Sequence, residues 1–191
     1  MASNRRRSPA KLIAERRTHH GEALMIEAPK GYEPTKEPWF RGGTEADRNA
    51  LMKLYYQYWL ANDVFDGSEL RKIWSADPES VFFNTNGHAY YGIDDWLKIW
   101  DHYRARMRLA KPGGTGAIKI TISGDMALIT DDHVGRFWNW IEEKNRPAFL
   151  IQRPYCRVTM VNMREKGEWK TIHVHFSMGR DGPRPDQGGP E

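Results

Sequence analysis

Apolar residues recur at helical spacing in three stretches of the chain. In residues 44–62 the positions Leu51, Leu54, Tyr55, Tyr58 and Trp59 lie three or four apart, and the text Thr-Glu-Ala-Asp at 44–47 has the form of a helix start. A shorter helix is expected over residues 69–74, with the serine at position 68 as its cap. A third is expected over residues 93–109, and Lys-Pro-Gly-Gly at 111–114 ends it.

The rest of the chain has the patterns of strands and turns. Residues 80–92 are typical of a hairpin, with an aromatic strand, an Asn-Gly turn and a return strand. Strands are then expected over residues 117–123, 126–140, 149–163 and 169–177, in an antiparallel meander. A sheet of this length buries one face against helices, and bent around them it forms a cone with an open mouth. The sequence therefore predicts an α+β fold.

The last predicted strand carries two histidines, His173 and His175, two residues apart. Because side chains alternate along a strand, they are expected on one face with Trp169, and Ile172, Val174 and Phe176 on the other, outer face. A hairpin pivoting on Lys166 would place Thr159 opposite His173 and Arg157 opposite His175. Tyr155 would then share the surface of the two histidines.

Charge divides the chain into an arm, a body and a tail. Residues 1–43 hold nine Lys and Arg against five Glu, whereas the remaining 148 residues hold twenty charges of each sign. We therefore expect a basic N-terminal extension over residues 1–43, a domain over 44–178 and a flexible tail over 179–191. A neutral body without a reading motif argues against nucleic acid as a partner.

Two absences in the sequence bear on the compartment. The chain has one cysteine, Cys156, so no intramolecular disulfide can form. It has no apolar run of the length that a membrane span or a secretory signal requires. We expect a cytoplasmic protein with no membrane partner.

Three short sequence motifs, in this order, resemble those of the SnoaL-like branch of the nuclear transport factor 2-like (NTF2-like) superfamily. They are Tyr91-Gly92 leading into a helix, Gly-Asp-Met-Ala at 124–127, and Trp169 followed by His173, His175 and Ser177. The resemblance covers residues 44–178. It implies a cone-shaped barrel of a curved, mostly antiparallel sheet wrapped around three helices. It also implies a homodimer or homotrimer, in which a symmetric partner would cover the outer apolar face of the last strand.

The paired histidines admit three interpretations. They could chelate a metal ion if a third ligand such as His133 or Asp132 approached, or they could be structural. They could also pass protons, with Arg157 holding an oxyanion. Scytalone dehydratases, members of the same superfamily, place an aspartate near the end of the first helix, and Asp63 is the similar position. The resulting prediction has no metal and names as catalytic His173, His175, Asp63, Arg157 and His133.

Aromatic residues make up 12% of the chain, which suits a flat aromatic ligand. The expected wall of its site consists of Tyr55, Trp59, Trp100, Tyr155 and Trp138. Many relatives are cofactor-free enzymes, and among them the chain is most similar to lyases that remove formaldehyde from lignin-derived diarylpropane diols to give a stilbene. We therefore expect a cofactor-independent lyase acting on an aromatic small molecule. The alternatives are a dehydratase or isomerase of a similar substrate, and a non-catalytic module that binds a hydrophobic ligand.

Overall fold

A computed structural model of the 191-residue chain describes residues 26–112, 114–142, 155–179 and 184–188. Its helices are α1 (Glu45–Val64), α2 (Gly67–Ile73) and α3 (Gly92–Arg104), with a short 3₁₀ turn at Pro185–Gln187. Its strands are β1 (Trp39–Arg41), β2 (Val81–Phe83), β3 (Ala89–Tyr91), β4 (Met107–Pro112), β5 (Lys119–Ser123), β6 (Met126–Trp140), β7 (Tyr155–Glu165) and β8 (Glu168–Met178). No helix in these ranges is long and apolar enough to cross a membrane.

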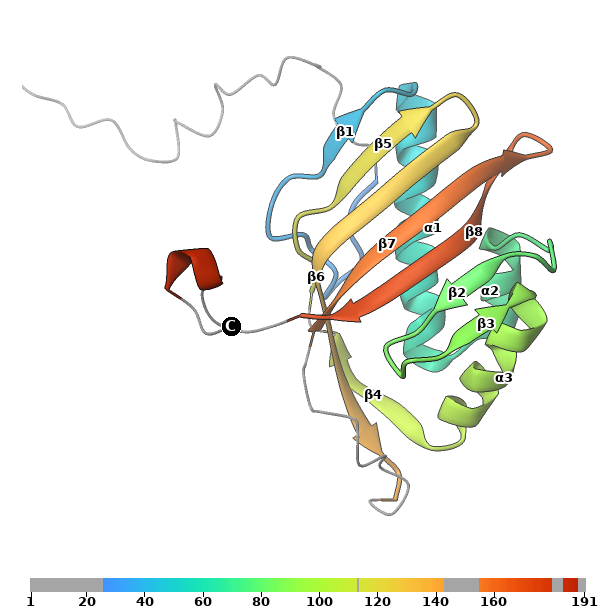
Figure 1. Cartoon of the computed structure of the whole chain (residues 1–191), viewed down its shortest axis with the longest axis vertical. Coiled ribbons are helices and arrows are strands. Elements are labelled where there is room, and N and C mark those ends of the chain that lie inside the picture. Colours follow the sequence, from blue (N-terminus) through green and yellow to red (C-terminus); the bar gives the residue numbers. More distant parts are fainter. Residues whose placement is uncertain (1–25, 113, 143–154, 180–183, 189–191) are drawn as a thin grey trace, which may run out of the picture.

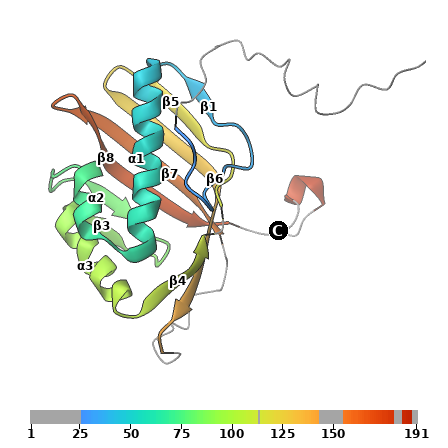
Figure 2. The ribbon, with the colours of Figure 1, turned by 180° about the vertical axis from the view of Figure 1, so that it is seen from behind.

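One curved sheet carries the fold. Its strands lie in the order β1-β5-β6-β7-β8-β2-β3, and β4 pairs with the C-terminal part of β6. The helix α1 runs across one face of this sheet, called here the inner face, while α2 and α3 lie beside β2 and β3 (Figures 1 and 2). The prediction of an α+β fold with three helices and a mostly antiparallel curved sheet is confirmed. The sheet is not closed into a barrel, because β1 and β3 end the order without pairing with each other.

The chain forms these helices largely where its caps predict them. Thr44 and Asp47 make the predicted capping box of α1, and Phe65 ends the helix in the left-handed region at a φ of 53°. The cap of α2 is Asp66 and not Ser68, because the Asp66 carboxylate accepts from the backbone N–H groups of residues 68 and 69. The helix boundaries at residues 44–62 and 69–74 are therefore close to those predicted.

The predicted third helix is too long. It ends at Arg104, and its expected last turn belongs instead to β4, which pairs antiparallel with β6 from Met107 opposite Trp140 to Pro112 opposite Arg136. Without β4, the end of β6 would have an unpaired backbone edge. Helical spacing of apolar residues in this stretch is overridden by that pairing.

A β-bulge in β8 decides which face the histidines occupy. Asn162 pairs with Thr171, but Val161 pairs with His173, so Ile172 is an extra residue without a partner. Alternation therefore changes phase at Ile172: Trp169 and Thr171 are buried on the inner face, and so are Val174 and Phe176. His173 and His175 lie on the other, outer face.

The bulge, together with a two-residue turn at Lys166 and Gly167, corrects two predictions. Arg157 pairs with Ser177 and Thr159 with His175, so the predicted pairs of Arg157 with His175 and of Thr159 with His173 are wrong. Val174 and Phe176, expected on the outer face, are core residues, 0% and 7% exposed. The core already covers them, so they give no reason for an oligomer interface, and the homodimer or homotrimer stays a prediction.

Segments beyond the predicted domain limits also take part in the structure. Within residues 26–43, which the charge pattern places in the arm, Tyr32 is 1% exposed and β1 pairs parallel with β5. The tail carries the 3₁₀ turn, which lies away from the sheet (Figure 1).

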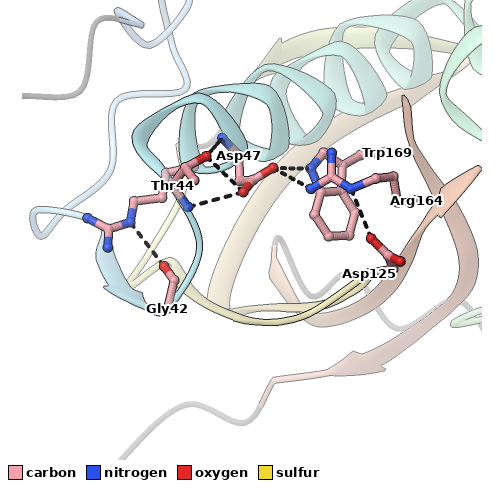
Figure 3. A network of polar contacts seen from close by, with 7 residues as sticks. Gly42, Thr44, Asp47, Asp125, Arg164 and Trp169 are labelled. Atoms are coloured by element: carbon pink, nitrogen blue, oxygen red, sulfur yellow. Dashed lines mark hydrogen bonds and ion pairs between the residues drawn. The ribbon is translucent and has the colours of Figure 1, made fainter. Parts of the chain in front are cut away.

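The start of α1 is fixed to the β7–β8 hairpin through the carboxylate of Asp47 (Figure 3). One of its oxygens accepts from Arg164 Nη2 at 2.5 Å and from Trp169 Nε1 at 3.2 Å, while the other accepts from Thr44 N at 3.1 Å. The Arg164 guanidinium also stacks over the Trp169 ring at 4.4 Å and reaches the Asp125 carboxylate at 3.1 Å. The hydrogen bond from Arg164 holds the pKa of Asp47 well below its usual range, against the opposing effect of burial.

We expect Asp47→Asn to lower the free energy of unfolding by about 1–3 kcal/mol at pH 7, because it removes a charge-assisted hydrogen bond. An unfolded aspartate titrates near about pH 4, and folding depresses the pKa of Asp47. The contribution of Asp47 is therefore complete above about pH 4 and is lost as the pH falls below that value. Urea unfolding between pH 2 and 7 measures the effect.

Asp125→Asn is the matched control, because Asp125 contacts the same arginine with a side chain 76% exposed. It should change the free energy of unfolding by less than about 0.5 kcal/mol. Equal losses in the two variants would contradict the anchoring role of Asp47.

Candidate functional site

The structure divides the predicted site residues between the two faces of the sheet. On the inner side, α1 carries three of them, α3 carries one, and the C-terminal part of β6 carries one whose ring stacks on Phe65: Tyr55, Trp59, Asp63, Trp100 and Trp138. The outer face carries the other five: His133, Tyr155, Arg157, His173 and His175. The sheet therefore lies between the histidines and Asp63, which are predicted to belong to one catalytic site.

The outer set consists of surface side chains. The ring of His173 bonds through Nδ1 to the carbonyl oxygen of Val81 at 2.6 Å, and the exposed ring of Phe83 lies edge-on to both His173 and His175. Arg157 donates to the carbonyl of Met178 at 3.4 Å. Within the described residues no group of three or more His, Cys, Asp or Glu side chains could hold a metal ion.

The second part of the outer set lies farther along the sheet. His133 is exposed, and its ring stacks on that of Tyr155 with centroids 4.3 Å apart. A β-bulge in β6 between Asp131 and Val134 places His133 there. The His133 ring thus lies on the outer face, although its backbone N–H donates to the Asp131 carboxylate at 2.9 Å.

The inner face holds an acid that the sequence analysis did not select, Asp131. It is 2% exposed and is the one charged side chain among the buried residues that the structure describes. Its Oδ2 accepts from the hydroxyl of Tyr55 at 2.6 Å, and its Oδ1 accepts from the backbone N–H groups of Gly116 and His133, both at 2.9 Å. Asp131 thus connects α1 to the sheet through a phenol–carboxyl pair.

Burial raises the pKa of Asp131, although the hydrogen bonds from Tyr55, His133 and Gly116 act in the opposite direction. The neighbouring hydroxyl of Tyr56 has its pKa raised to about 12, chiefly by burial and further by the charges of Asp131 and Glu33. Asp131 therefore keeps a proton to higher pH than a surface aspartate does.

A second phenol–carboxyl pair lies at the end of α1, two helical turns beyond Tyr55. The hydroxyl of Tyr32 donates to Oδ2 of Asp63, which is half-buried. The carbonyl of Tyr32 accepts from Thr115 Oγ1 at 3.0 Å, and the next residue, Gly116, donates to Asp131. Residues 115–116 thus join the two pairs, and we call the four side chains Tyr32, Tyr55, Asp63 and Asp131 the inner acid site.

Several aromatic rings lie on the same side of the sheet as this site. Trp59 lies edge-on to both Tyr55 and Phe176 at 5.9 Å, and Phe65 stacks on Trp138 at 4.9 Å and lies edge-on to Trp100 at 5.8 Å. Two carboxyl groups in different surroundings can serve as the general acid and the general base of a reaction. Aromatic side chains are suited to binding an aromatic ligand.

The sequence offered a signal for Asp131 but none for Tyr32. Asp131 lies two and four residues after the apolar Ile129 and Ala127, so strand alternation places it on the face toward the core. Only its neighbours Asp132 and His133 are named above as candidate ligands. Tyr32 reaches its partner from a charged, proline-rich segment without periodicity. Its contact depends on tertiary structure alone.

The fold is that of the NTF2-like proteins, as shown by solved structures to which this chain is similar. An NTF2-like protein from Cytophaga hutchinsonii is 14% identical, with a TM-score of 0.55 over 69% of this chain and 98% of its own. A candidate dehydratase of the NTF2-like family from Streptomyces avermitilis is 13% identical, with a TM-score of 0.55 over 72% and 99%.

A candidate aromatic ring hydroxylase from Novosphingobium aromaticivorans is 17% identical, with a TM-score of 0.57 over 78% of this chain and all of its own. No curated protein matches the sequence. The profile of the SnoaL-like domain matches residues 49–181, and the chain belongs to that family. The resemblance to the SnoaL-like branch of the NTF2-like superfamily is confirmed.

Asp131→Asn should change how stability depends on pH. Folding raises the pKa of Asp131, so its contribution is complete below about pH 4 and is lost as the pH rises through the folded pKa. The neutral amide cannot ionise. As the pH rises from 4 to 8, we therefore expect the wild type to lose free energy of unfolding relative to the variant. Urea unfolding at each pH measures this difference. Asp132→Asn, at the exposed neighbouring position, should follow the wild type, and parallel curves for Asp131→Asn would contradict the role of burial.

Tyr55→Phe should lower the free energy of unfolding by about 1–3 kcal/mol, because a buried carboxyl oxygen loses its donor. Tyr91→Phe removes the hydroxyl of a residue that is 63% exposed and should cost less than about 0.5 kcal/mol. Thermal or urea unfolding compares the two, and a neutral Tyr55→Phe would show that the hydrogen bond contributes nothing.

Proposed function

We propose that the protein is a cofactor-independent lyase that acts on an aromatic small molecule by general acid–base catalysis at the inner acid site. The observation that carries this proposal is the pair of tyrosine–aspartate contacts among aromatic rings on the inner face. The candidate dehydratase and the candidate aromatic ring hydroxylase of the same fold support it as chemistry that the fold accommodates.

The proposed reaction converts a lignin-derived diarylpropane diol into a stilbene, formaldehyde and water. A base removes the proton of the terminal hydroxyl, and its oxygen–carbon bond becomes the carbonyl of formaldehyde. The electron pair of the breaking carbon–carbon bond forms the double bond, and the benzylic hydroxyl leaves with a proton from an acid. Atoms and electrons balance without an oxidant or reductant.

The inner acid site supplies both proton roles in this scheme. Asp63, half-buried at the end of α1, is the proposed base for the terminal hydroxyl. Asp131, whose pKa burial raises, is the proposed source of the other proton, which would pass through the Tyr55 hydroxyl 2.6 Å away. The proton-transfer roles that the sequence predicts for His173 and His175 are assigned here to Asp63 and Asp131, because the histidines lie on the outer face.

We expect the purified protein to release formaldehyde and stilbene from a diarylpropane diol, and Asp63→Asn to lower kcat by about 10²–10⁴-fold. Asp101→Asn, the same change at a side chain 66% exposed, should leave kcat unchanged. Formaldehyde is measured colorimetrically and the stilbene by its absorbance, with and without prior chelator treatment.

Product mass decides between this reaction and its alternatives. Loss of water alone identifies a dehydratase, and an unchanged mass with a moved double bond identifies an isomerase. Ligand binding without turnover of any of these substrates rejects the enzyme and favours a hydrophobic-ligand-binding module.

A further inference from the structure

Residues 26–38 form a strap that precedes the family domain, whose profile match begins at residue 49. A tight turn orients the strap, with Tyr32 N donating to the carbonyl of Pro29 at 2.9 Å. Gly31 takes a φ of +86°, and a Cβ there would lie 2.5 Å from Pro112 Cγ. The strap therefore packs against the end of β4 at a position that favours glycine.

Contacts on both sides of Tyr32 fix its position. Its carbonyl accepts from Thr115 Oγ1 at 3.0 Å, and Thr35 N donates to the carbonyl of Thr115 at 3.1 Å. Pro34 forms an isolated parallel bridge with Thr115. With the backbone held in this way, the ring of Tyr32 is 1% exposed and its hydroxyl meets Asp63.

The place of Asp63 in α1 is electrostatically unfavourable for a carboxylate. Asp63 is the last residue but one of the helix, and no basic residue stands in the last turn. Exposed carbonyl groups give a helix C-terminus a partial negative charge, which repels a carboxylate. A phenol donor from another segment compensates for this repulsion and restricts the side chain to one orientation.

We propose that Tyr32 is a positioning residue of the inner acid site, and that the strap completes a site which the family domain alone leaves without this donor. The inference rests on the proposed function, because Asp63 is the base in that reaction. Tyr32 acts through Asp63 and does not itself exchange a proton with the substrate.

The first test separates positioning from folding. Tyr32→Phe keeps the ring and removes the hydroxyl, so we expect kcat to fall about tenfold or more while KM stays within about twofold, by loss of an aligned base. Tyr91→Phe is the matched control and should leave both constants unchanged. A Tyr32→Phe variant that loses stability but keeps the wild-type kcat would overturn the inference.

The second test needs no turnover. Tyr32→Ala opens a space lined by Asp63, and p-cresol has the shape and hydroxyl of the missing side chain, whereas toluene has only the ring. We expect p-cresol to raise the Tm of Tyr32→Ala by about 2 °C or more above the effect of toluene, and this preference to vanish in Tyr32→Ala/Asp63→Leu, which has no acceptor at position 63. Equal effects of the two compounds would overturn the inference.

A spectroscopic measurement covers the case in which Tyr32→Ala does not fold. In protein labelled with ¹³C at tyrosine Cζ, the Tyr32 signal should move in Asp63→Asn and stay in place in Asp101→Asn; a signal that ignores Asp63→Asn counts against the contact. A wild type that turns over no substrate rejects the proposed function, and the p-cresol preference then decides the strap separately.

Discussion

One unpaired residue in β8, Ile172, sets the chemistry of both faces of the sheet. A strand has a period of two, so a single extra residue exchanges the faces for every side chain beyond it. Trp169 and Thr171 before the bulge and Val174 and Phe176 after it all reach the core, which strict alternation would forbid. The histidines are placed on the outside as the consequence of burying these side chains.

The inner face gains its polar chemistry from residues that each satisfy a buried partner. Asp131 accepts three hydrogen bonds from α1, from the loop before β5 and from its own strand, so it supports the fold as well as lying at the site. Asp63 is less enclosed and has a donor from outside the family domain. The family domain thus holds the Asp131 carboxyl group in place, and the segment before that domain supplies the donor to Asp63.

Local signals made most of the fold predictable. The capping box at Thr44 and Asp47, the Asn-Gly turn between β2 and β3, and the turn before β8 each depend on neighbouring residues, and each occurs close to its predicted place. The bulges in β6 and β8 do not follow from local text, because they arise where two strands must both bury their apolar side chains.

The candidate site was predictable only in part for the same reason. Tyr55, Trp59 and Asp63 share a helix face by their spacing, and the structure keeps them on the inner side. The partners of that stripe, Asp131 and Tyr32, are 76 and 31 residues away from the side chains they contact. Pairings over such distances depend on the topology of the fold, which cannot be predicted from the local sequence pattern.

The contacts of the strap also suggest an order of folding. Tyr32 is held by Thr115, 83 residues later in the chain, and Thr115 precedes β5. Contacts between distant segments form after the intervening chain has closed its loops. We therefore expect the strap to dock after β4 and β5 are in place, and a partly folded chain to lack the contact between Tyr32 and Asp63. The environment of the Asp63 carboxylate would thereby depend on completion of the native structure.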